Sequence, residues 1–278
     1  MTCRICGAEA RLWGDRGDVA LYRCLRCRFI SGRPAREQPA DERYENYYHG
    51  APPAAPSARY QEWLARAEAV VGRGRLLEIG AGSGGFVRVA LARGWVVDAI
   101  EVSRTGIDAL RATGTNVFAG DVTAAGYLPE TFDLVVSLEV LEHLPAPLTH
   151  LRELQRITRP GGLLLLSTPN FDGLTRRLLG LWWRVVDPEH HGYFTLKSLK
   201  RALREAGYSR VTVTSRSLDI TSWRRARDGK PVSFDPQTSA RLRDAVDSSR
   251  LLRAAKVAAN ILLGLTGLGD TLLTWARR

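Results

Sequence analysis

The chain is organised around one eleven-residue stretch, Leu76-Leu-Glu-Ile-Gly-Ala-Gly-Ser-Gly-Gly-Phe86. Its apolar start predicts a buried parallel strand, and its glycines predict a sharp turn into a helix that begins near Gly84. Glycines at 80, 82 and 84 lack Cβ atoms, so the backbone can approach a nucleotide-like ligand at the helix N-terminus. The spacing, with Gly85, also satisfies the dinucleotide pattern. Glu78 favours a ligand that carries a positive charge, because its carboxylate would repel a pyrophosphate.

Length and charge limit the remaining possibilities. With 278 residues, 45% of them hydrophobic, the chain has room for one large α/β domain and small additions. No stretch reaches the ~20 apolar residues that span a bilayer, and no apolar segment follows the first charges as in an export signal. We therefore expect a cytoplasmic protein. The net charge of +11 resides in residues 176–278, which hold 20 Lys or Arg against 9 acids. Attraction for an acidic partner is expected there.

The first 27 residues contain all four cysteines, as Cys3-x-x-Cys6 and Cys24-x-x-Cys27. This spacing is typical of a Zn²⁺ site with four thiolate ligands, brought together by a hairpin. Two disulfides or four unused thiols are the alternatives, and disulfides are disfavoured in a chain without an export signal. Residues 1–30 are thus predicted to form a zinc ribbon. Its site is structural, since four thiolates leave no open position, and the metal supplies the folding energy.

Residues 31–56 are a Pro- and Ala-rich connector that contains Tyr44-Glu-Asn-Tyr-Tyr48. Two interpretations are open. The tyrosines fasten the connector to the main domain, or Tyr47 and its neighbours reach over the cofactor pocket as a lid.

Two acidic residues after the glycine loop extend the ligand site. Glu101 ends the apolar segment Trp95–Ile100, where a carboxylate can accept hydrogen bonds from both ribose hydroxyls of a nucleotide. Asp121 follows a short strand at 116–119 and is placed to accept from an exocyclic amine. Further strands are predicted at 132–137, 163–167, 210–217 and 269–276, with helices at 57–71, 84–93, 104–112, 147–158 and 196–207.

This succession of motifs resembles the class I S-adenosylmethionine-dependent methyltransferases, in particular the group that includes the ubiquinone-biosynthesis O-methyltransferase. The resemblance covers about residues 57–217. It rests on Glu78-x-Gly80-x-Gly82-x-Gly84, Glu101, Gly120-Asp121, Phe132-Asp133-Leu-Val, Glu139-x-x-Glu-His143 and Arg159-Pro-Gly-Gly162.

The resemblance implies a Rossmann-like sheet of seven strands with an antiparallel last strand. It also implies S-adenosylmethionine as cofactor, contacted by Gly80, Gly82, Glu101 and Asp121, with Leu138 near its adenine or methionine portion. Glu78, Gly84 and Tyr47 complete the predicted cofactor-binding set. The four-cysteine ribbon resembles that of some deoxysugar C-methyltransferases and of an rRNA guanine methyltransferase, two very different substrate classes.

Three histidines are candidates for the catalytic step. His190 and His191 lie in a segment that similar enzymes carry over the pocket, and either is a candidate general base or acceptor anchor. The alternative is one structural and one solvated histidine. His143 lies beside the active face, where it either takes part in catalysis or braces a loop.

The methyltransferase domain is predicted to occupy residues 57–278, with a helical insertion at 218–268 between strands six and seven. A helix from about residue 240 to 263 mixes basic and apolar residues. It either packs on its own domain or meets an anionic membrane surface, which would place the protein peripherally at the membrane.

The sequence favours methyl transfer to a small-molecule acceptor, a hydroxyl or carbon of a sugar or other metabolite, including a lipid-linked one. Methylation of an rRNA base is an alternative that the ribbon and the basic C-terminal region permit, although no aromatic and basic platform for RNA is visible. A non-catalytic cofactor-binding adapter is another, and an NAD-dependent dehydrogenase is the least favoured. The sequence does not identify the acceptor or the oligomeric state.

Overall fold

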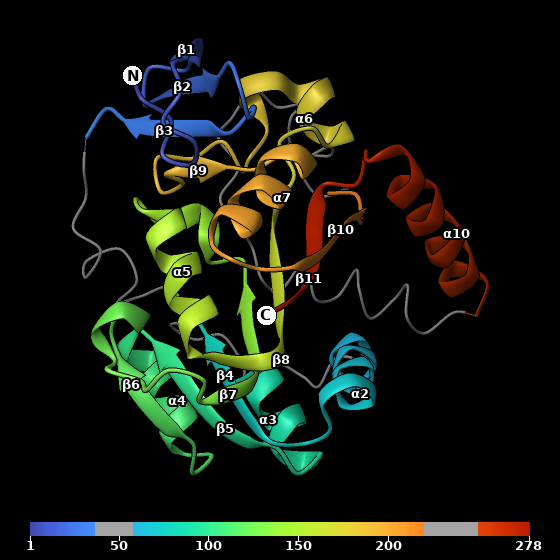
Figure 1. Cartoon of the computed structure of the whole chain (residues 1–278). Helices are drawn as coiled ribbons and strands as arrows, with labels where there is room; N and C mark the ends of the chain where they lie inside the picture. Colours follow the sequence, from blue (N-terminus) through green and yellow to red (C-terminus); the bar gives the residue numbers. More distant parts are fainter. Residues whose placement is uncertain (37–57, 220–249) are drawn as a thin grey trace.

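The computed structural model describes residues 1–36, 58–219 and 250–278, which form two β-sheets with helices around the larger one (Figure 1). The larger sheet contains β4 (Arg75–Ile79), β5 (Val96–Glu101), β6 (Asn116–Ala119), β7 (Phe132–Leu138), β8 (Thr158–Pro169), β10 (Arg210–Arg216) and β11 (Thr271–Arg277). The smaller sheet contains β1 (Ala10–Asp15), β2 (Val19–Cys24), β3 (Ile30–Pro34) and β9 (Gly192–Tyr193).

The large sheet has the strand order β10-β11-β8-β7-β4-β5-β6. Strands β4 to β8 run parallel, whereas β11 is antiparallel to both β8 and β10. The order reverses direction between β4 and β7, and parallel α/β sheets bind ligands beyond the carboxyl ends of their strands at such a point. The predicted seven-stranded sheet with its antiparallel last strand is confirmed.

Helices cover both faces of this sheet. On one face, α5 (Pro147–Ile157) and α7 (Leu196–Glu205) pack on apolar side chains of β4, β7 and β8. On the other face lie α2 (Ala58–Val71), α3 (Gly85–Ala92) and α4 (Arg104–Arg111). The central strands are buried on both sides, which explains why they appear in the sequence as continuous apolar runs and not as alternating patterns.

The small sheet is antiparallel, and its fourth strand comes from a part of the chain more than 150 residues after the first three. β1, β2 and β3 come from the N-terminus, and β9 pairs with β3 through Ile30 with Tyr193 and Ser31 with Gly192. β3 continues past the predicted ribbon boundary at residue 30, to Pro34, which pairs with Val19 of β2. The unit is also not separate, because Cys27 and Phe29 belong to the same apolar cluster as α5 and α7.

Most predicted elements occur within one or two residues of their expected bounds. β8 is longer than expected, beginning at Thr158 instead of 163, because its first residues pair with Phe132 before the register shifts. Short elements were not predicted: η1 (Val122–Ala124), η2 (Leu141–His143), α6 (Leu174–Leu179), η3 (Gly180–Trp182) and β9.

The predicted lid with Tyr47 lies outside the described residues, as do residues 220–249 of the predicted insertion. The helix of that insertion among the described residues is α10 (Arg250–Thr266), which packs beside the edge strand β10 through Leu263. Ile261, Leu262 and Leu265 on the same helix are exposed. Among the described helices, none combines the length and the apolar character needed to cross a bilayer.

Candidate functional site

The glycine loop joins β4 to α3 in the predicted way. Gly80, Gly82 and Gly84 have φ values of 67°, 54° and 78°, a region that other residues enter only with strain. Gly84 is the N-cap of α3 and has no side chain to occupy the helix N-terminus. The loop backbone is held against the end of β5, because Gly80 N and Ala81 N both donate to the carbonyl oxygen of Ile100.

Glu101 closes the other side of this loop. Its carboxylate accepts hydrogen bonds from Gly82 N at 2.6 Å and from Val102 N and Ser103 N at 2.9 and 2.8 Å. Gly106 makes room for it, because a Cβ at that position would lie 2.8 Å from Glu101 Cγ. The side chain is thus fixed at the end of β5, where we expected a contact to ribose hydroxyls.

Glu78 lies buried beneath the loop. Burial raises the pKa of its carboxyl well above the usual range, and the nearby charge of Glu101 raises it further. Its Oε2 atom is buried and has no hydrogen-bond partner among the described residues. A buried acceptor in this state is costly, so two neighbouring carboxyls here favour a ligand that brings hydrogen-bond donors and positive charge.

Asp121 and Leu138 flank the loop at the ends of neighbouring strands. Leu138 is the last residue of β7 and is half-buried. Asp121 is exposed, and its Oδ1 accepts from Thr123 N at 2.8 Å, which caps η1. A depression beside Asp121 extends to Thr149 and His150 at the start of α5. His150 is buried, its ring nitrogens have no partner among the described residues, and burial lowers its pKa to about 4. No sequence pattern had indicated this residue.

A second group of polar side chains gathers where β7 ends. Glu142, His143 and His190 each offer a donor atom, and these atoms lie within 4.8 Å of one another. The rings of His143 and His190 meet edge to face with centroids 4.5 Å apart. The structure thus brings together two of the three predicted catalytic histidines. One carboxylate and two imidazoles can act in proton transfer or hold a divalent cation.

The hydrogen bond of His190 determines its tautomer. Nδ1 lies 2.7 Å from the carbonyl oxygen of Val185, which can only accept, so Nδ1 carries the proton and Nε2 keeps its lone pair. Burial lowers the pKa of His190 to about 4, which keeps the ring neutral near pH 7. The side chain of His191 does not belong to this group, but its backbone oxygen accepts from Gly32 N at 3.0 Å.

Two carboxyls of the Glu139-x-x-Glu142 motif lie at this edge, and neither was predicted as a site residue. Glu142 accepts from Thr168 Oγ1 at 2.9 Å, and burial raises its pKa well above the usual range. Glu139 accepts from Ser167 Oγ at 2.6 Å, and its φ of 55° is unusual for a residue with a side chain. Although Glu139 has accessible surface, the protein around its carboxyl raises its pKa.

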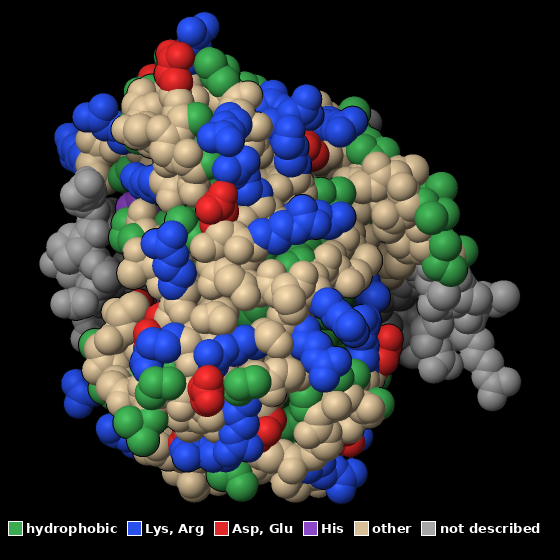
Figure 2. Space-filling view, viewed as in Figure 1, with side chains coloured by type: hydrophobic (Ala, Val, Ile, Leu, Met, Phe, Trp, Pro, Cys, Tyr) green, Lys and Arg blue, Asp and Glu red, His purple; other side chains and the backbone are tan. Residues whose placement is uncertain are grey.

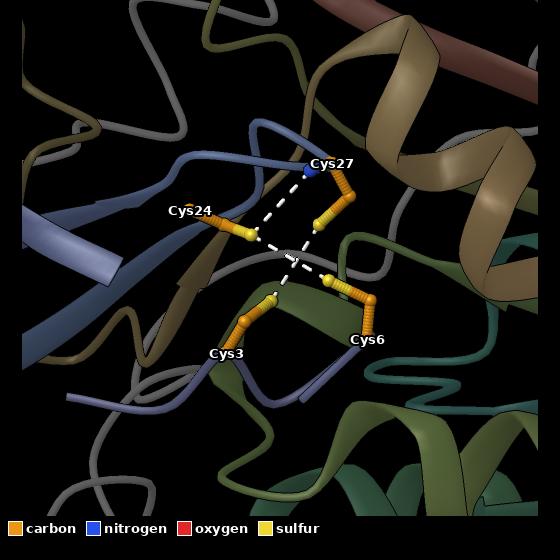
Figure 3. A group of neighbouring side chains, drawn as sticks. All are labelled: Cys3, Cys6, Cys24 and Cys27. Carbon is orange, nitrogen blue, oxygen red and sulfur yellow. Dashed lines mark hydrogen bonds between the residues drawn. The ribbon is translucent and has the colours of Figure 1, made fainter. Parts of the chain in front are cut away.

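The four cysteines converge as the spacing predicted (Figure 3). The sulfur atoms of Cys3 and Cys27, and those of Cys6 and Cys24, are 3.5 Å apart, and all four lie within 4.8 Å of one another. These separations are far beyond an S–S bond. Tetrahedral Zn–S bonds of ~2.3 Å would place sulfurs about 3.8 Å apart, so the donor set and its spacing fit a zinc ion.

Comparison with known protein families assigns this architecture. Residues 53–213 match the family model described as "Methyltransferase domain". The chain belongs to this methyltransferase family.

Curated relatives of the methyltransferase domain act on different compounds. The chain is 31% identical over 115 residues to the ubiquinone biosynthesis O-methyltransferase of Pseudomonas fluorescens, an alignment that covers 39% of this chain and 49% of the relative. It is 29% identical over 153 residues to the malonyl-[acyl-carrier protein] O-methyltransferase of Methylococcus capsulatus, covering 52% of this chain and 55% of the relative. The chain thus spans about half the length of these relatives.

Solved structures share the fold of this methyltransferase. A SAM-dependent methyltransferase from Archaeoglobus fulgidus aligns with a TM-score of 0.55 and 16% identity, covering 86% of this chain and all of that one. Phosphoethanolamine N-methyltransferase 2 of Haemonchus contortus, in complex with S-adenosyl-L-methionine, aligns with a TM-score of 0.56 and 16% identity, covering 90% and 62%. At these identities the likeness establishes the fold alone.

Proposed function

We propose that this methyltransferase transfers the methyl group of S-adenosylmethionine to a hydroxyl or carbon of a small-molecule acceptor. The observation that carries the proposal is the buried pair Glu78 and Glu101 beside the glycine loop. The unpartnered oxygen of Glu78 suits a cationic ligand, which would restore the charge that burial disfavours, whereas the anionic pyrophosphate of NAD would not.

The chain's residues divide the work of holding this cofactor. Glu101 would accept from the ribose hydroxyls with the oxygens that the loop backbone already orients, Glu78 would face the positive charge, and Asp121 would accept from the adenine amine. When bound, the cofactor supplies an electrophilic methyl carbon activated by the sulfonium. The protein then has to align the acceptor and remove its proton.

His190 is the proposed base for this proton. Its Nε2 lone pair is available because Nδ1 donates to Val185, and His143 packs against the same ring. The group lies where the chain leaves β7, close to the strand ends that border the cofactor loop. An acceptor hydroxyl between the loop and these imidazoles would meet both the methyl carbon and the base.

The cluster of Glu142, His143 and His190 also supports a metal-assisted variant of the same reaction. A divalent cation held by these three side chains would orient an acceptor oxygen and lower its pKa. It would also restore the charge that burial disfavours at Glu142. Turnover that disappears in chelator and returns with added Mg²⁺, Mn²⁺ or Zn²⁺ would select this variant over a free base.

A structural zinc ion is part of the proposal, held by Cys3, Cys6, Cys24 and Cys27. On the face drawn in Figure 2, a nucleic-acid acceptor receives less support. Figure 2 shows Lys and Arg side chains scattered over the face of α5 and α7, interrupted by acidic and uncharged residues, without a continuous basic stripe. Binding to a phosphate backbone relies on such a stripe.

The proposal is tested by calorimetry followed by mass spectrometry. We expect binding of S-adenosylmethionine and S-adenosylhomocysteine, and no binding of NAD at the same concentration. Metabolites from cells with and without the chain should then contain a pair that differs by one methylene, which names the acceptor. Absence of cofactor binding by the folded protein, or preferential NAD binding, would refute the proposal.

A further inference from the structure

The N-terminal four-cysteine unit holds the histidine segment directly. β3 pairs with β9, so Ser31 lies opposite Gly192, immediately after His190 and His191. The backbone oxygen of His191 accepts from Gly32 N at 3.0 Å and from Arg4 Nη1 at 3.2 Å. Two separate parts of the unit therefore fix one peptide group of the segment.

β3 and the histidine segment (residues 190–194) approach each other too closely for the segment to move independently of β3. A Cβ on Gly32 would lie 2.2 Å from the backbone oxygen of His190. On the next residue pair, a Cβ on Gly192 would lie 2.8 Å from the ring of Phe29. Phe29 is fully buried and packs on Phe194 with ring centroids 4.9 Å apart. These contacts fix the backbone of residues 190–194 to β3.

The cysteines determine where β3 begins. The chain between Cys24 and Cys27 forms a tight turn in which Cys27 N donates to Cys24 Sγ at 3.4 Å, and Cys24 N donates to the oxygen of Phe29 at 2.8 Å. Phe29 and Gly32 follow this turn within a few residues. A metal ion on the four sulfurs thus fixes the origin of the strand that supports the histidines.

Because β3 holds the backbone of His190, it also limits where the imidazole of His190 can lie. Its ring is bounded by Val185 O, by His143 and by Tyr193, whose ring centroid lies 5.8 Å away. A small displacement of the segment would separate the two histidine rings, and misplacement of a reacting group by about 1 Å can cost a factor of about 100 in rate.

We propose that the metal site of Cys3, Cys6, Cys24 and Cys27 is a positioning element of the acceptor site, acting through β3 on His190 and His191. The metal ion would be needed for turnover and for the placement of these histidines, but not for binding of the cofactor. The turnover part rests on the methyl transfer proposed above. The part concerning histidine placement does not.

The first test measures placement without using activity. Diethyl pyrocarbonate modifies neutral imidazoles according to their accessibility, and mass spectrometry reads each histidine separately. We compare the zinc-loaded full chain with the same chain after zinc removal, verified by metal analysis. Modification of His190 should become at least about fivefold faster. His150 in α5 is the internal control and should stay slow, because it is buried beside the depression at Asp121 and, among the described residues, its ring has no hydrogen bond to the small sheet.

The second test uses variants that keep the cysteines. Gly32→Ala should retain one zinc ion and the cofactor Kd within about twofold, but lower kcat on the identified acceptor at least tenfold and expose His190 to modification. Ser31→Ala is the matched control, since Ser31 is a buried neighbour whose hydroxyl has no partner among the described residues. Arg4→Gln should lower kcat by a smaller factor, and Arg11→Gln, which loses only an exposed pair with Glu9, should leave it unchanged.

The outcomes separate the two proposals. Unchanged modification of His190 in both the zinc-free chain and Gly32→Ala would overturn the positioning role. So would full kcat in these proteins. Faster modification of His190 in a protein that binds no S-adenosylmethionine would refute the proposed function and keep the coupling. Equal acceleration at His150 in the zinc-free chain would mean global unfolding, and Gly32→Ala would then decide alone.

Discussion

The two sheets of this protein are stabilised in different ways. In the large sheet, four of the five residues of β4 are buried, and helices cover both faces. In the small sheet, β1 buries only its first residue, Ala10, whereas β2 and β3 share a small apolar cluster with Phe171 and Trp183. The unit also contains four clustered sulfur atoms and a strand, β9, from a distant part of the chain. The first sheet is specified by local apolar patterns, whereas the second takes one strand from a distant part of the chain and, in the proposal above, holds a zinc ion. A change of similar size should therefore have very different effects in the two regions.

The largest effect is expected from the metal site itself. Cys24→Ser removes one thiolate from a closed four-ligand site, and structural zinc contributes an apparent ~10–16 kcal/mol of binding free energy in small zinc domains. We expect one zinc per chain in the wild type, none in the variant, and loss of amide protection in β1 to β3 while the large sheet keeps its protection. Hydrogen exchange with metal analysis measures both. If wild-type protein purified in the absence of chelator contains no zinc, the proposed stabilisation of the small sheet by a metal ion is wrong.

Replacement of His190 and His191 by alanine should affect turnover alone. General base catalysis contributes roughly 10²–10⁴ in rate, so kcat should fall at least a hundredfold. Cofactor affinity should change less than twofold, because neither residue belongs to the glycine loop. Kinetics on the identified acceptor and calorimetry make the comparison. Full turnover in the double variant would rule out the base assignment.

Glu101→Ala should weaken S-adenosylmethionine binding about tenfold or more, because a charge-assisted hydrogen bond contributes about 1.5–3 kcal/mol. Gly106→Ala should act in the same direction by displacing the Glu101 side chain. Asp108→Ala, an exposed acid on α4, is the control for charge. If Asp108→Ala weakens binding as much as Glu101→Ala, the effect comes from long-range charge and the ribose contact is wrong.

The smallest effect is expected on the outer layer of the large sheet. Glu68 in α2 accepts from Arg93 Nη2 at 2.6 Å and from Trp95 Nε1 at 3.1 Å, and the Arg93 guanidinium lowers the pKa of Glu68 to about 2. A carboxyl with a lowered folded-state pKa stabilises the fold above its unfolded value of 4.5 and loses this contribution as pH falls toward 2. Because the pair is partly solvated, Glu68→Gln should cost only about 1 kcal/mol at pH 7.

Urea unfolding at pH 7 and pH 3 tests this sign. The difference between wild type and Glu68→Gln should be smaller at pH 3. Glu62→Gln, on the exposed side of the same helix, should show no such difference. A larger effect of Glu68→Gln at the lower pH would mean that the arginine contacts do not stabilise the carboxylate.

Sequence patterns predicted the large sheet because its central strands are short apolar runs between turn signals and its edge strand β10 alternates Val with Thr. The strand at 116–119 was predicted with its exact bounds, and Glu101 was correctly placed at the end of its strand, while its role in cofactor binding stays a prediction. β9 could not be predicted, because Gly192 and Tyr193 form no apolar run and pair only through a tertiary contact. Glu142 and His150 were not predicted as site residues for a related reason. A charged or polar residue shows its burial only in the folded chain.

The pairing of β3 with β9 also sets an order of assembly. Strands β1 to β3 and the four thiolates leave the ribosome together, so a hairpin with bound metal can form early from local contacts. Its fourth strand, β9, is synthesised only after the first five strands of the large sheet. The two residue pairs between β3 and β9 offset only a small part of the entropy lost when so long a loop is closed. Docking of the two units therefore has to follow collapse of the large sheet around Phe194. During synthesis, the N-terminal hairpin lacks the ring of Phe194 on which Phe29 packs, so the apolar side chain of Phe29 stays exposed until the histidine segment arrives.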